Sequence, residues 1–236
     1  MILAIDCGNS RIKWGAWLDG RWIARGTAGY DDARTLDTEW ALLPAPRSVA
    51  IANVAGEAAQ AALAPFLGRL PVAARWIRAQ ASQCGVENGY GEPARLGADR
   101  WAALIGARSL HRGACIVVMA GTATTIDRLD ADGRFRGGLI LPGTGLMKRA
   151  LASNTADLPH ASGHWRAFPV ATDDAIESGC IEAQLGAIER MHARIEGGAL
   201  CLLSGGAAES LAPMLNIPVR VVDNLVLEGL VRMASE

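Results

Sequence analysis

The chain has 236 residues, half of them hydrophobic and one fifth charged, which supplies a core for one large domain or two small ones. Its 23 Lys and Arg residues against 24 Asp and Glu residues leave a net charge of −1, which excludes a generally polybasic binder of nucleic acids or membrane surfaces. Five cysteines without a CxxC pair predict buried or free thiols in a reducing cytoplasm, and we expect neither a signal peptide nor a membrane span.

The first half of the chain is predicted to begin with three strands and then to alternate strands with helices. Short apolar runs indicate the strands, and a Gly-Asn-Ser segment and Asp19-Gly20 indicate the first two turns. The expected strands are 2–5, 12–18, 21–25, 48–54 and 74–79, and the expected helices are 57–67 and 98–110.

The second half repeats this pattern. An apolar run is again followed by a Gly turn, an extended segment and an Asp-Gly turn. The expected strands are 116–119, 124–129, 135–141, 199–203 and 219–222, and the expected helices are 145–152, 173–195, 207–211 and 225–233.

Two glycine spacings align the halves without a gap. Gly8 matches Gly121 and Gly20 matches Gly133, each at an offset of 113 positions. We interpret this as a duplication of an α/β domain, with one copy in residues 1–112 and the other in residues 113–236. Each copy is predicted to be a mixed sheet flanked by helices, with a cleft between the two.

The segment from Asp6 to Lys13 is the first candidate site. It places a carboxylate at the end of a buried strand, then a Gly turn with small polar residues, then a basic residue. The backbone N–H groups of such a turn bind phosphate oxygens, while Asp6 suits a hydrated Mg²⁺ and Lys13 neutralises phosphate charge. The alternative is that Asp6 and Asn9 only satisfy the backbone of the turn.

The segment from Gly121 to Thr125 is the copy of this turn in the second half. Its hydroxyls and amide groups, together with the first turn, suit a phosphate chain held from two sides. The alternative is that Thr124 and Thr125 are ordinary β-branched strand residues. The glycines of Ser204-Gly205-Gly206 are expected to let the backbone approach a nucleobase, a weaker signal because Gly-Gly is also a common turn.

A third candidate site lies where the helix 98–110 begins. Asp99 is a candidate acceptor for a substrate hydroxyl proton, although an Asp in a first helical turn also serves as a cap, and the helix dipole is expected to keep its pKa low. Arg100 has the fork geometry to pair with a substrate carboxylate. Tyr90, between Gly89 and Gly91, is expected to form a mobile wall.

Five motifs in sequence resemble the type III pantothenate kinase family. This family belongs to the acetate kinase, sugar kinase, Hsp70 and actin superfamily, whose two duplicated RNase H-like domains hold a nucleotide between them. The motifs are Asp6-x-Gly8-Asn9-Ser10, Gly97-x-Asp99-Arg100, Gly121-Thr122-Ala123-x-Thr125 with Asp127, Gly137-Gly138-x-Ile140-x-Pro142-Gly143 and Ser204-Gly205-Gly206.

The resemblance implies ATP-dependent phosphorylation of pantothenate to 4′-phosphopantothenate, the first step of coenzyme A synthesis. It implies that Asp99 accepts the hydroxyl proton, that Asp6 binds Mg²⁺ and that the protein is a homodimer with the pantothenate site near the subunit contact. The residues that it assigns to ATP are Asp6, Cys7, Gly8, Asn9, Ser10, Arg11, Ile12, Lys13 and Thr122, and those that it assigns to pantothenate are Tyr90, Gly97, Ala98, Asp99, Arg100 and Thr172.

Two positions depart from the family pattern. Ser10 replaces the usual Thr and keeps its hydroxyl, whereas Met119 stands where many members have an Asp that binds a monovalent cation, K⁺ or NH₄⁺. A thioether is a poor ligand for a hard cation. We therefore expect weak or absent K⁺ activation, or a cation held by other oxygens.

Two other functions remain open at this point. One is a non-catalytic accessory factor in virulence-gene regulation, a name that some relatives carry, and the other is a superfamily kinase for a different hydroxylated acid or sugar. The presence of Asp6, Asp99, Arg100 and Thr122 favours catalysis, because a pure binding protein does not need them.

Overall fold

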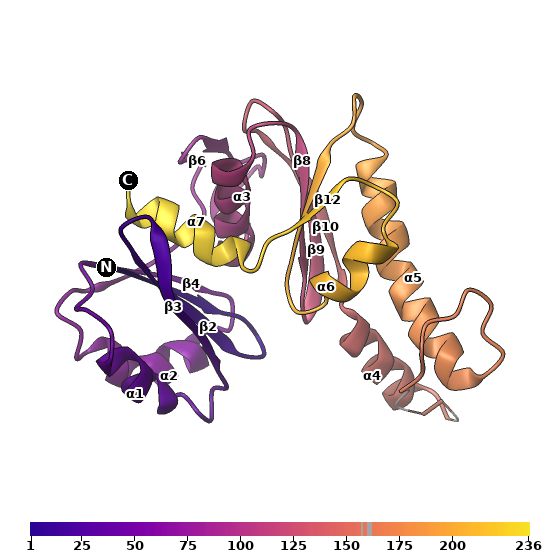
Figure 1. The fold of residues 1–236 in the computed structure, drawn as a ribbon, viewed down its shortest axis with the longest axis horizontal. Helices are drawn as coiled ribbons and strands as arrows, with labels where there is room; N and C mark the ends of the chain where they lie inside the picture. The colour runs from indigo at the N-terminus through magenta and orange to yellow at the C-terminus, as the bar shows by residue number, and fades with distance from the viewer. Residues whose placement is uncertain (157, 160–161) are drawn as a thin grey trace. The chain divides into compact units, whose positions relative to one another are not determined.

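The structure, a computed structural model, describes residues 1–156, 158–159 and 162–236, and its contacts divide the chain into two units (Figure 1). Unit 1 comprises Met1–Arg112, Gly133–Phe135 and Asn224–Glu236, and unit 2 comprises Gly113–Asp132 and Arg136–Asp223. The last helix thus belongs by its contacts to unit 1, whereas the division at residues 112 and 113 places it in the second half. The predicted cleft between the halves stays a prediction.

Unit 1 contains a five-stranded sheet in the order β3-β2-β1-β4-β5. The antiparallel pairs β1–β2 and β2–β3 form the predicted meander, and β4 and β5 add to it in parallel. The strands are β1 (Ile2–Cys7), β2 (Ile12–Leu18), β3 (Arg21–Ala28), β4 (Ser48–Asn53) and β5 (Ala74–Trp76).

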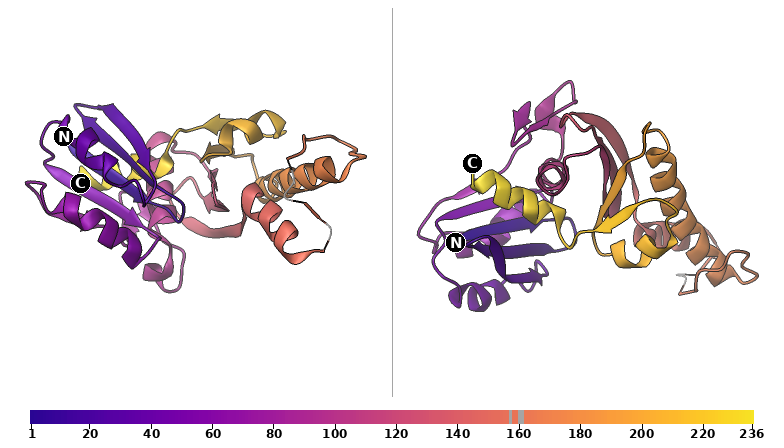
Figure 2. Two further views of the ribbon diagram at one scale, coloured as in Figure 1. Left: turned by 90° about the horizontal axis from the view of Figure 1, so that it is seen from below. Right: turned by 45° about the horizontal axis from the view of Figure 1, so that its top comes forward.

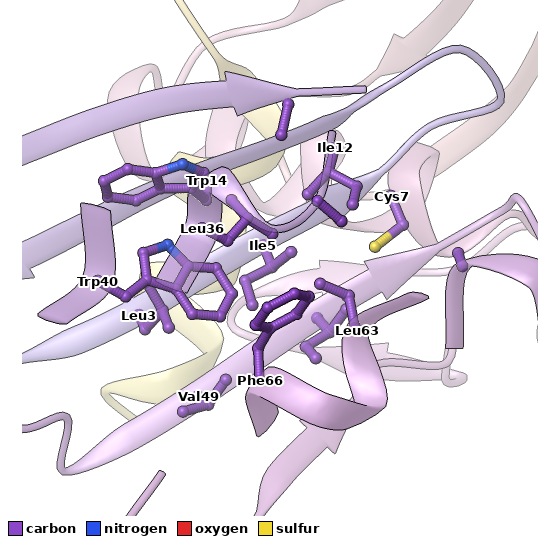
Figure 3. Close-up of a cluster of buried hydrophobic side chains, with 14 of the residues drawn as sticks. Leu3, Ile5, Cys7, Ile12, Trp14, Leu36, Trp40, Val49, Leu63 and Phe66 are labelled. Carbon is purple, nitrogen blue, oxygen red and sulfur yellow. The ribbon is translucent and has the colours of Figure 1, made fainter. Parts of the chain in front are cut away.

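Helices cover both faces of this sheet, which explains why every residue of β1 is buried. On one face, α1 (Thr35–Ala41) and α2 (Glu57–Leu67) supply side chains such as Trp40 and Phe66 to a core with Leu3 and Trp14 (Figure 3). On the other face, α7 (Leu225–Ala234) packs against β1 and β4, and it lies beside α3 (Ala98–Leu110) (Figure 2).

Unit 2 repeats the topology of unit 1, with the sheet order β10-β9-β8-β11-β12. Strand β8 has the bounds of β1 shifted by the 113 positions that separate Gly8 from Gly121, which agrees with the predicted duplication. The strands are β8 (Cys115–Ala120), β9 (Ala123–Leu129), β10 (Phe135–Pro142), β11 (Leu200–Ser204) and β12 (Val219–Val221). The helices are α4 (Thr144–Asn154), α5 (Thr172–His192) and α6 (Ala208–Leu211), with α5 and α6 contributing to one buried core.

The predicted elements are nearly all present, and helices α2 and α3 have the predicted bounds. The sequence pattern does not predict α1, because Arg34 at its N-cap position makes no side-chain capping bond and leaves no start signal. It also missed the hairpin of β6 (Ser82–Gln83) and β7 (Val86–Glu87), whose two-residue strands are too short to show an alternating pattern. Two 3₁₀ turns, η1 (Pro93–Arg95) and η2 (Ala212–Met214), complete the described elements.

All five cysteines are free thiols, as predicted, and Cys84 is the one among them that is not buried. Within residues 1–156, 158–159 and 162–236, no helix is both long enough and apolar enough to cross a membrane.

Candidate active site

The first turn lies at the carboxyl end of β1. Asp6 is 7 % exposed and is the register partner of Lys13 on β2, so the two opposite charges face each other across the antiparallel pair. Between the strands, Asn9, Ser10 and Arg11 are exposed, as a ligand-binding turn requires. The structure therefore brings the predicted carboxylate, polar turn and lysine together in unit 1.

Burial changes the chemistry of Asp6. It raises the pKa of this carboxyl from its ordinary value of 3.8 to about 7, because the loss of hydration outweighs the attraction of Lys13 and the nearby Asp99 adds repulsion. A carboxylate in this state gains stability from a cation. Among the described residues no group of three or more His, Cys, Asp or Glu side chains is arranged to hold a metal. A single carboxylate such as Asp6 offers one oxygen ligand, and Mg²⁺ is an ion that keeps several water ligands and takes few from protein.

Asp99 lies in the first turn of α3, after Gly97 at the N-cap position. Its Oδ1 atom accepts a hydrogen bond of 2.7 Å from the backbone N–H of Arg100, so it contributes to capping as the alternative interpretation proposed. The expectation of a low pKa is wrong. Burial raises the pKa of Asp99 despite the bond from the Arg100 backbone and the charge of Arg100. A raised pKa makes this carboxylate a better proton acceptor.

Asp6 and Asp99 lie close enough that the charge of Asp99 raises the pKa of Asp6. The residue that follows β4 lies between the two segments. The Val54 backbone N–H donates to the Cys7 carbonyl oxygen, next to Asp6, over 3.1 Å. Val54 also lies close to Gly97, the residue that precedes α3. Two carboxylates separated by most of the first domain in sequence thus share one region of unit 1.

Arg100 and Tyr90 form the third part of the site. Arg100 is 5 % exposed, and its Nη1 atom donates to the Tyr90 hydroxyl over 2.9 Å. Its guanidinium carbon lies 5.8 Å from the centre of the Tyr90 ring. The Tyr90 backbone N–H donates in turn to Asn88 Oδ1 over 3.0 Å. This orients a guanidinium fork, which suits binding of a carboxylate.

The second turn lies between β8 and β9 in unit 2, where Gly121 and Thr122 are exposed. Position 143, the last of the motif that begins at Gly137, has room only for glycine, because a Cβ atom there would lie 2.1 Å from the Gly121 carbonyl oxygen. Its backbone N–H donates to the Thr122 carbonyl oxygen over 2.9 Å. Close packing by Gly143 therefore supports the turn that presents Thr122.

Two threonines of the second candidate segment are strand residues. Thr124 and Thr125 are buried in β9, which is the alternative interpretation considered for them, and Thr125 is the register partner of the partly buried Met119. In the described part of the chain the Thr125 Oγ1 atom is buried without a hydrogen-bond partner. Across the strand pair from this hydroxyl, Met119 offers a thioether and no oxygen ligand.

Thr172 is the first residue of α5 and is exposed. It lies at a groove of about 780 Å³ in unit 2, which α4 and α5 line mainly with apolar side chains such as Met147, Leu151 and Ile176. Thr172 and Thr122 belong to unit 2, and the remaining predicted site residues belong to unit 1.

Sequence reasoning missed three residues around the site. The Tyr30 hydroxyl donates to the Gly8 carbonyl oxygen over 2.6 Å, and burial raises its pKa to about 12, which keeps this donor protonated. Asn88 carries a local signal, since an Asn two residues before Tyr90 typically bonds the backbone of its own loop. Phe135 stacks on Tyr90 with ring centres 5.7 Å apart, a contact for which the sequence holds no signal.

Comparisons with known proteins show what the chain is similar to. A family model described as type III pantothenate kinase matches residues 2–194. A type III pantothenate kinase of Aromatoleum aromaticum is 55 % identical over 238 residues, covering 100 % of this chain and 98 % of that protein.

Two solved structures have similar folds. One, assigned to the Baf family of transcriptional activators and from Campylobacter jejuni, has a TM-score of 0.64 at 21 % identity and covers 99 % of this chain and 97 % of its own. The other is the activator of the 2-hydroxyisocaproyl-CoA dehydratase from Clostridium difficile with bound ADPNP, with a TM-score of 0.58 at 12 % identity and coverage of 99 % and 92 %. At these identities the likeness concerns the fold alone. It confirms the predicted α/β class, with two mixed sheets flanked by helices in an actin-like arrangement of strands.

Proposed function

The chain belongs to the type III pantothenate kinase family, and from this premise we propose a role for each part of its site. As a member of this family it is a phosphotransferase that phosphorylates pantothenate in coenzyme A biosynthesis, with ATP as the phosphoryl donor. We propose that the acceptor is the primary hydroxyl of pantothenate and that the product is 4′-phosphopantothenate.

We propose that the first turn binds the phosphates of ATP through its backbone N–H groups and that Lys13 neutralises part of their charge. Asp6 would hold Mg²⁺, which when bound neutralises negative charge on the phosphate oxygens. The raised pKa of Asp6 supports this assignment, because a buried carboxylate without a cation is unfavourable. We further propose that Thr122 contacts ATP.

We propose that Asp99 orients the acceptor hydroxyl and takes its proton at a carboxylate oxygen. Phosphoryl transfer needs mainly positioning and charge stabilisation, so a carboxylate is sufficient for this role. Arg100 would pair with the pantothenate carboxylate, because its guanidinium is already oriented by the Tyr90 hydroxyl. Tyr90, Gly97, Ala98 and Thr172 would complete the pantothenate-binding surface.

The observation that carries this proposal is the pairing of Asp6 with Asp99. Two carboxylates, both with raised pKa values, lie near each other at the ends of β1 and α3, and each matches a family motif. Repulsion between two buried carboxylates is unfavourable. It is relieved when a cation binds to one of them and the other accepts a proton, which supports a functional role for the pair.

We also propose that the protein is a homodimer and acts in the cytoplasm. Phe168 and Val170 are 93 % and 102 % exposed, and the apolar groove that Thr172 borders lies in the same unit. Exposed apolar surface of this kind is typical of an interface. The five free thiols agree with a reducing compartment.

The experiment that tests the proposed function is an assay of ADP release with three acceptors, pantothenate, glycerol and acetate, each with and without Mg²⁺. We expect Mg²⁺-dependent ADP release with pantothenate and only background release with the others. Release with glycerol or acetate instead would identify a kinase for another acceptor. If none of the three acceptors gives ADP release above background, the result would favour an accessory factor that does not transfer phosphate.

A further inference from the structure

Phe135 is the first residue of β10, yet it belongs with Gly133 and Arg134 to unit 1. Its side chain is 0 % exposed and its ring stacks on that of Tyr90, with the centres 5.7 Å apart and the planes inclined by 26°. The guanidinium carbon of Arg100 lies 5.8 Å from the centre of the Phe135 ring. Phe135 therefore contacts both side chains that are proposed to bind the acceptor.

Backbone contacts place this ring. Gly133 has a φ of +90°, and a Cβ atom there would lie 2.2 Å from the Gly85 carbonyl oxygen, so the two backbones touch. The Glu87 backbone N–H donates to the Gly133 carbonyl oxygen over 2.9 Å, and the Glu87 carboxylate pairs with Arg134 at 3.2 Å. The hairpin tip is thus attached to the β6–β7 hairpin, close to the loop that carries Tyr90.

Three contacts then hold Tyr90. Asn88 Oδ1 accepts from its backbone N–H, and Phe135 supports one face of its ring. The hydroxyl at the far end of the ring accepts from Arg100. Without the Phe135 ring, Tyr90 has more side-chain freedom, and the orientation of the Arg100 fork loosens with it.

We propose that Phe135 is a positioning residue for pantothenate, which acts by holding Tyr90 and, through it, Arg100. The inference rests on the proposed function, because it assumes that these two side chains bind the acceptor. It predicts that a residue outside the five family motifs determines the affinity for pantothenate and not the affinity for ATP.

The duplicated hairpin supplies a matched control. Trp22 occupies the position in the first copy that Phe135 occupies in the second, since Asp19-Gly20-Arg21-Trp22 aligns with Asp132-Gly133-Arg134-Phe135. Trp22 contacts Trp17 at 5.0 Å between ring centres and donates to Glu228 over 2.7 Å. Trp22 is thus an aromatic residue at the same hairpin position, and its contacts with Trp17, Glu228 and Arg25 involve none of the proposed binding residues.

The test compares Phe135→Leu with Trp22→Leu in steady-state kinetics. We expect Phe135→Leu to raise the KM for pantothenate about fivefold to tenfold while kcat and the KM for ATP change less than about twofold. Trp22→Leu is expected to lower the melting temperature and to leave both KM values unchanged. If Phe135→Leu does not fold, Phe135→Met, whose flexible unbranched side chain adapts better to the space left by the ring, takes its place.

A second measurement asks whether Phe135 acts through Tyr90. In a Tyr90→Leu background we expect Phe135→Leu to have little further effect on the KM for pantothenate. An unchanged KM in Phe135→Leu, or equal effects on pantothenate and ATP, would overturn the inference while leaving the proposed function intact. A wild-type protein without pantothenate-dependent ADP release would overturn both.

Discussion

The two copies of the strand–turn–strand unit have the same topology but carry different charge. In the first copy a buried Asp6 faces Lys13 across the strand pair, and in the second a partly buried Met119 faces Thr125. Asp6 has its pKa raised to about 7, whereas the second turn presents only neutral groups at the matching position. The turns also differ in length, since residues 8–11 join β1 to β2 and only residues 121–122 join β8 to β9. A duplicated topology therefore carries two turns of different chemistry.

The difference indicates a division of roles. A buried carboxylate reduces the stability of the protein, and at this position only the first copy carries one. This agrees with the cation proposed at Asp6. The second turn offers hydroxyl and backbone groups, which are suited to bind phosphate or sugar without a charge of their own. Changes in the first turn should accordingly affect the reaction more than changes in the second.

The largest effect is expected from removing the charge of the first turn. Asp6→Asn should lower kcat about 10³-fold, because the amide cannot hold Mg²⁺ against the phosphates as a carboxylate does. The change is measured as pantothenate-dependent ADP release at saturating ATP. Met119→Leu, at the matching position of the second copy, is the control and should retain most activity. Comparable losses in both variants would remove the distinction between the turns.

The pH dependence of stability should also separate the two turns. The folded protein holds a proton on Asp6 up to about pH 7, well above its ordinary pKa of 3.8. This tighter proton binding stabilises the folded protein relative to the unfolded chain. The contribution is complete at low pH and is lost as the pH rises through 7. With Mg²⁺ removed, the free energy of unfolding should fall by about 3 kcal/mol between pH 5 and pH 8.

Urea denaturation at the two pH values measures this change. Asp6→Asn should show a much smaller decrease, with a remainder that comes from Asp99, whose pKa is also raised. A stability that rises from pH 5 to pH 8 in the wild type, or a decrease of the same size in Asp6→Asn, would contradict the account of Asp6.

A smaller effect is expected at the second turn. Thr122→Ala should raise the KM for ATP about tenfold through the loss of one hydrogen bond to a charged ligand, with little change in the KM for pantothenate. Thr122→Ser keeps the hydroxyl and should be close to the wild type. An effect of Thr122→Ala on pantothenate alone would place this residue elsewhere in the site.

The smallest effect is expected from the monovalent cation. Because Met119 offers no oxygen, initial rates in potassium and sodium buffers should differ by less than about twofold. Met119→Asp should make the rate more sensitive to potassium. A large potassium effect in the wild type would show instead that other oxygens hold the cation.

The sequence predicts regular elements well where the local signal is strong. The apolar run of β1 and the periodic helices α2 and α3 were predicted within one or two residues, and the spacing of Gly8 and Gly121 predicted the repeated topology. Helix α1 has no capping signal, and contacts that join distant segments, such as Phe135 on Tyr90, leave no trace in a local pattern.

The candidate site shows the same limit. The motifs predict candidate residues, whose roles stay predictions, and the expected direction of the Asp99 pKa is wrong. The helix dipole is a local effect that favours the charged form, whereas burial among segments distant in sequence dominates and raises the pKa of Asp99. Turns and charges are local properties of a sequence, whereas desolvation depends on the completed fold.

The most direct test of the proposed mechanism is a single comparison of Asp99→Asn with the wild type, in which turnover and ATP binding are measured on the same preparation. Removing the proton acceptor should lower pantothenate-dependent ADP release about 10²-fold or more, while the Kd for ATP with Mg²⁺ stays within about threefold. Near-normal turnover in Asp99→Asn would contradict the role of Asp99, and with it the assignment of the acceptor site to the start of α3.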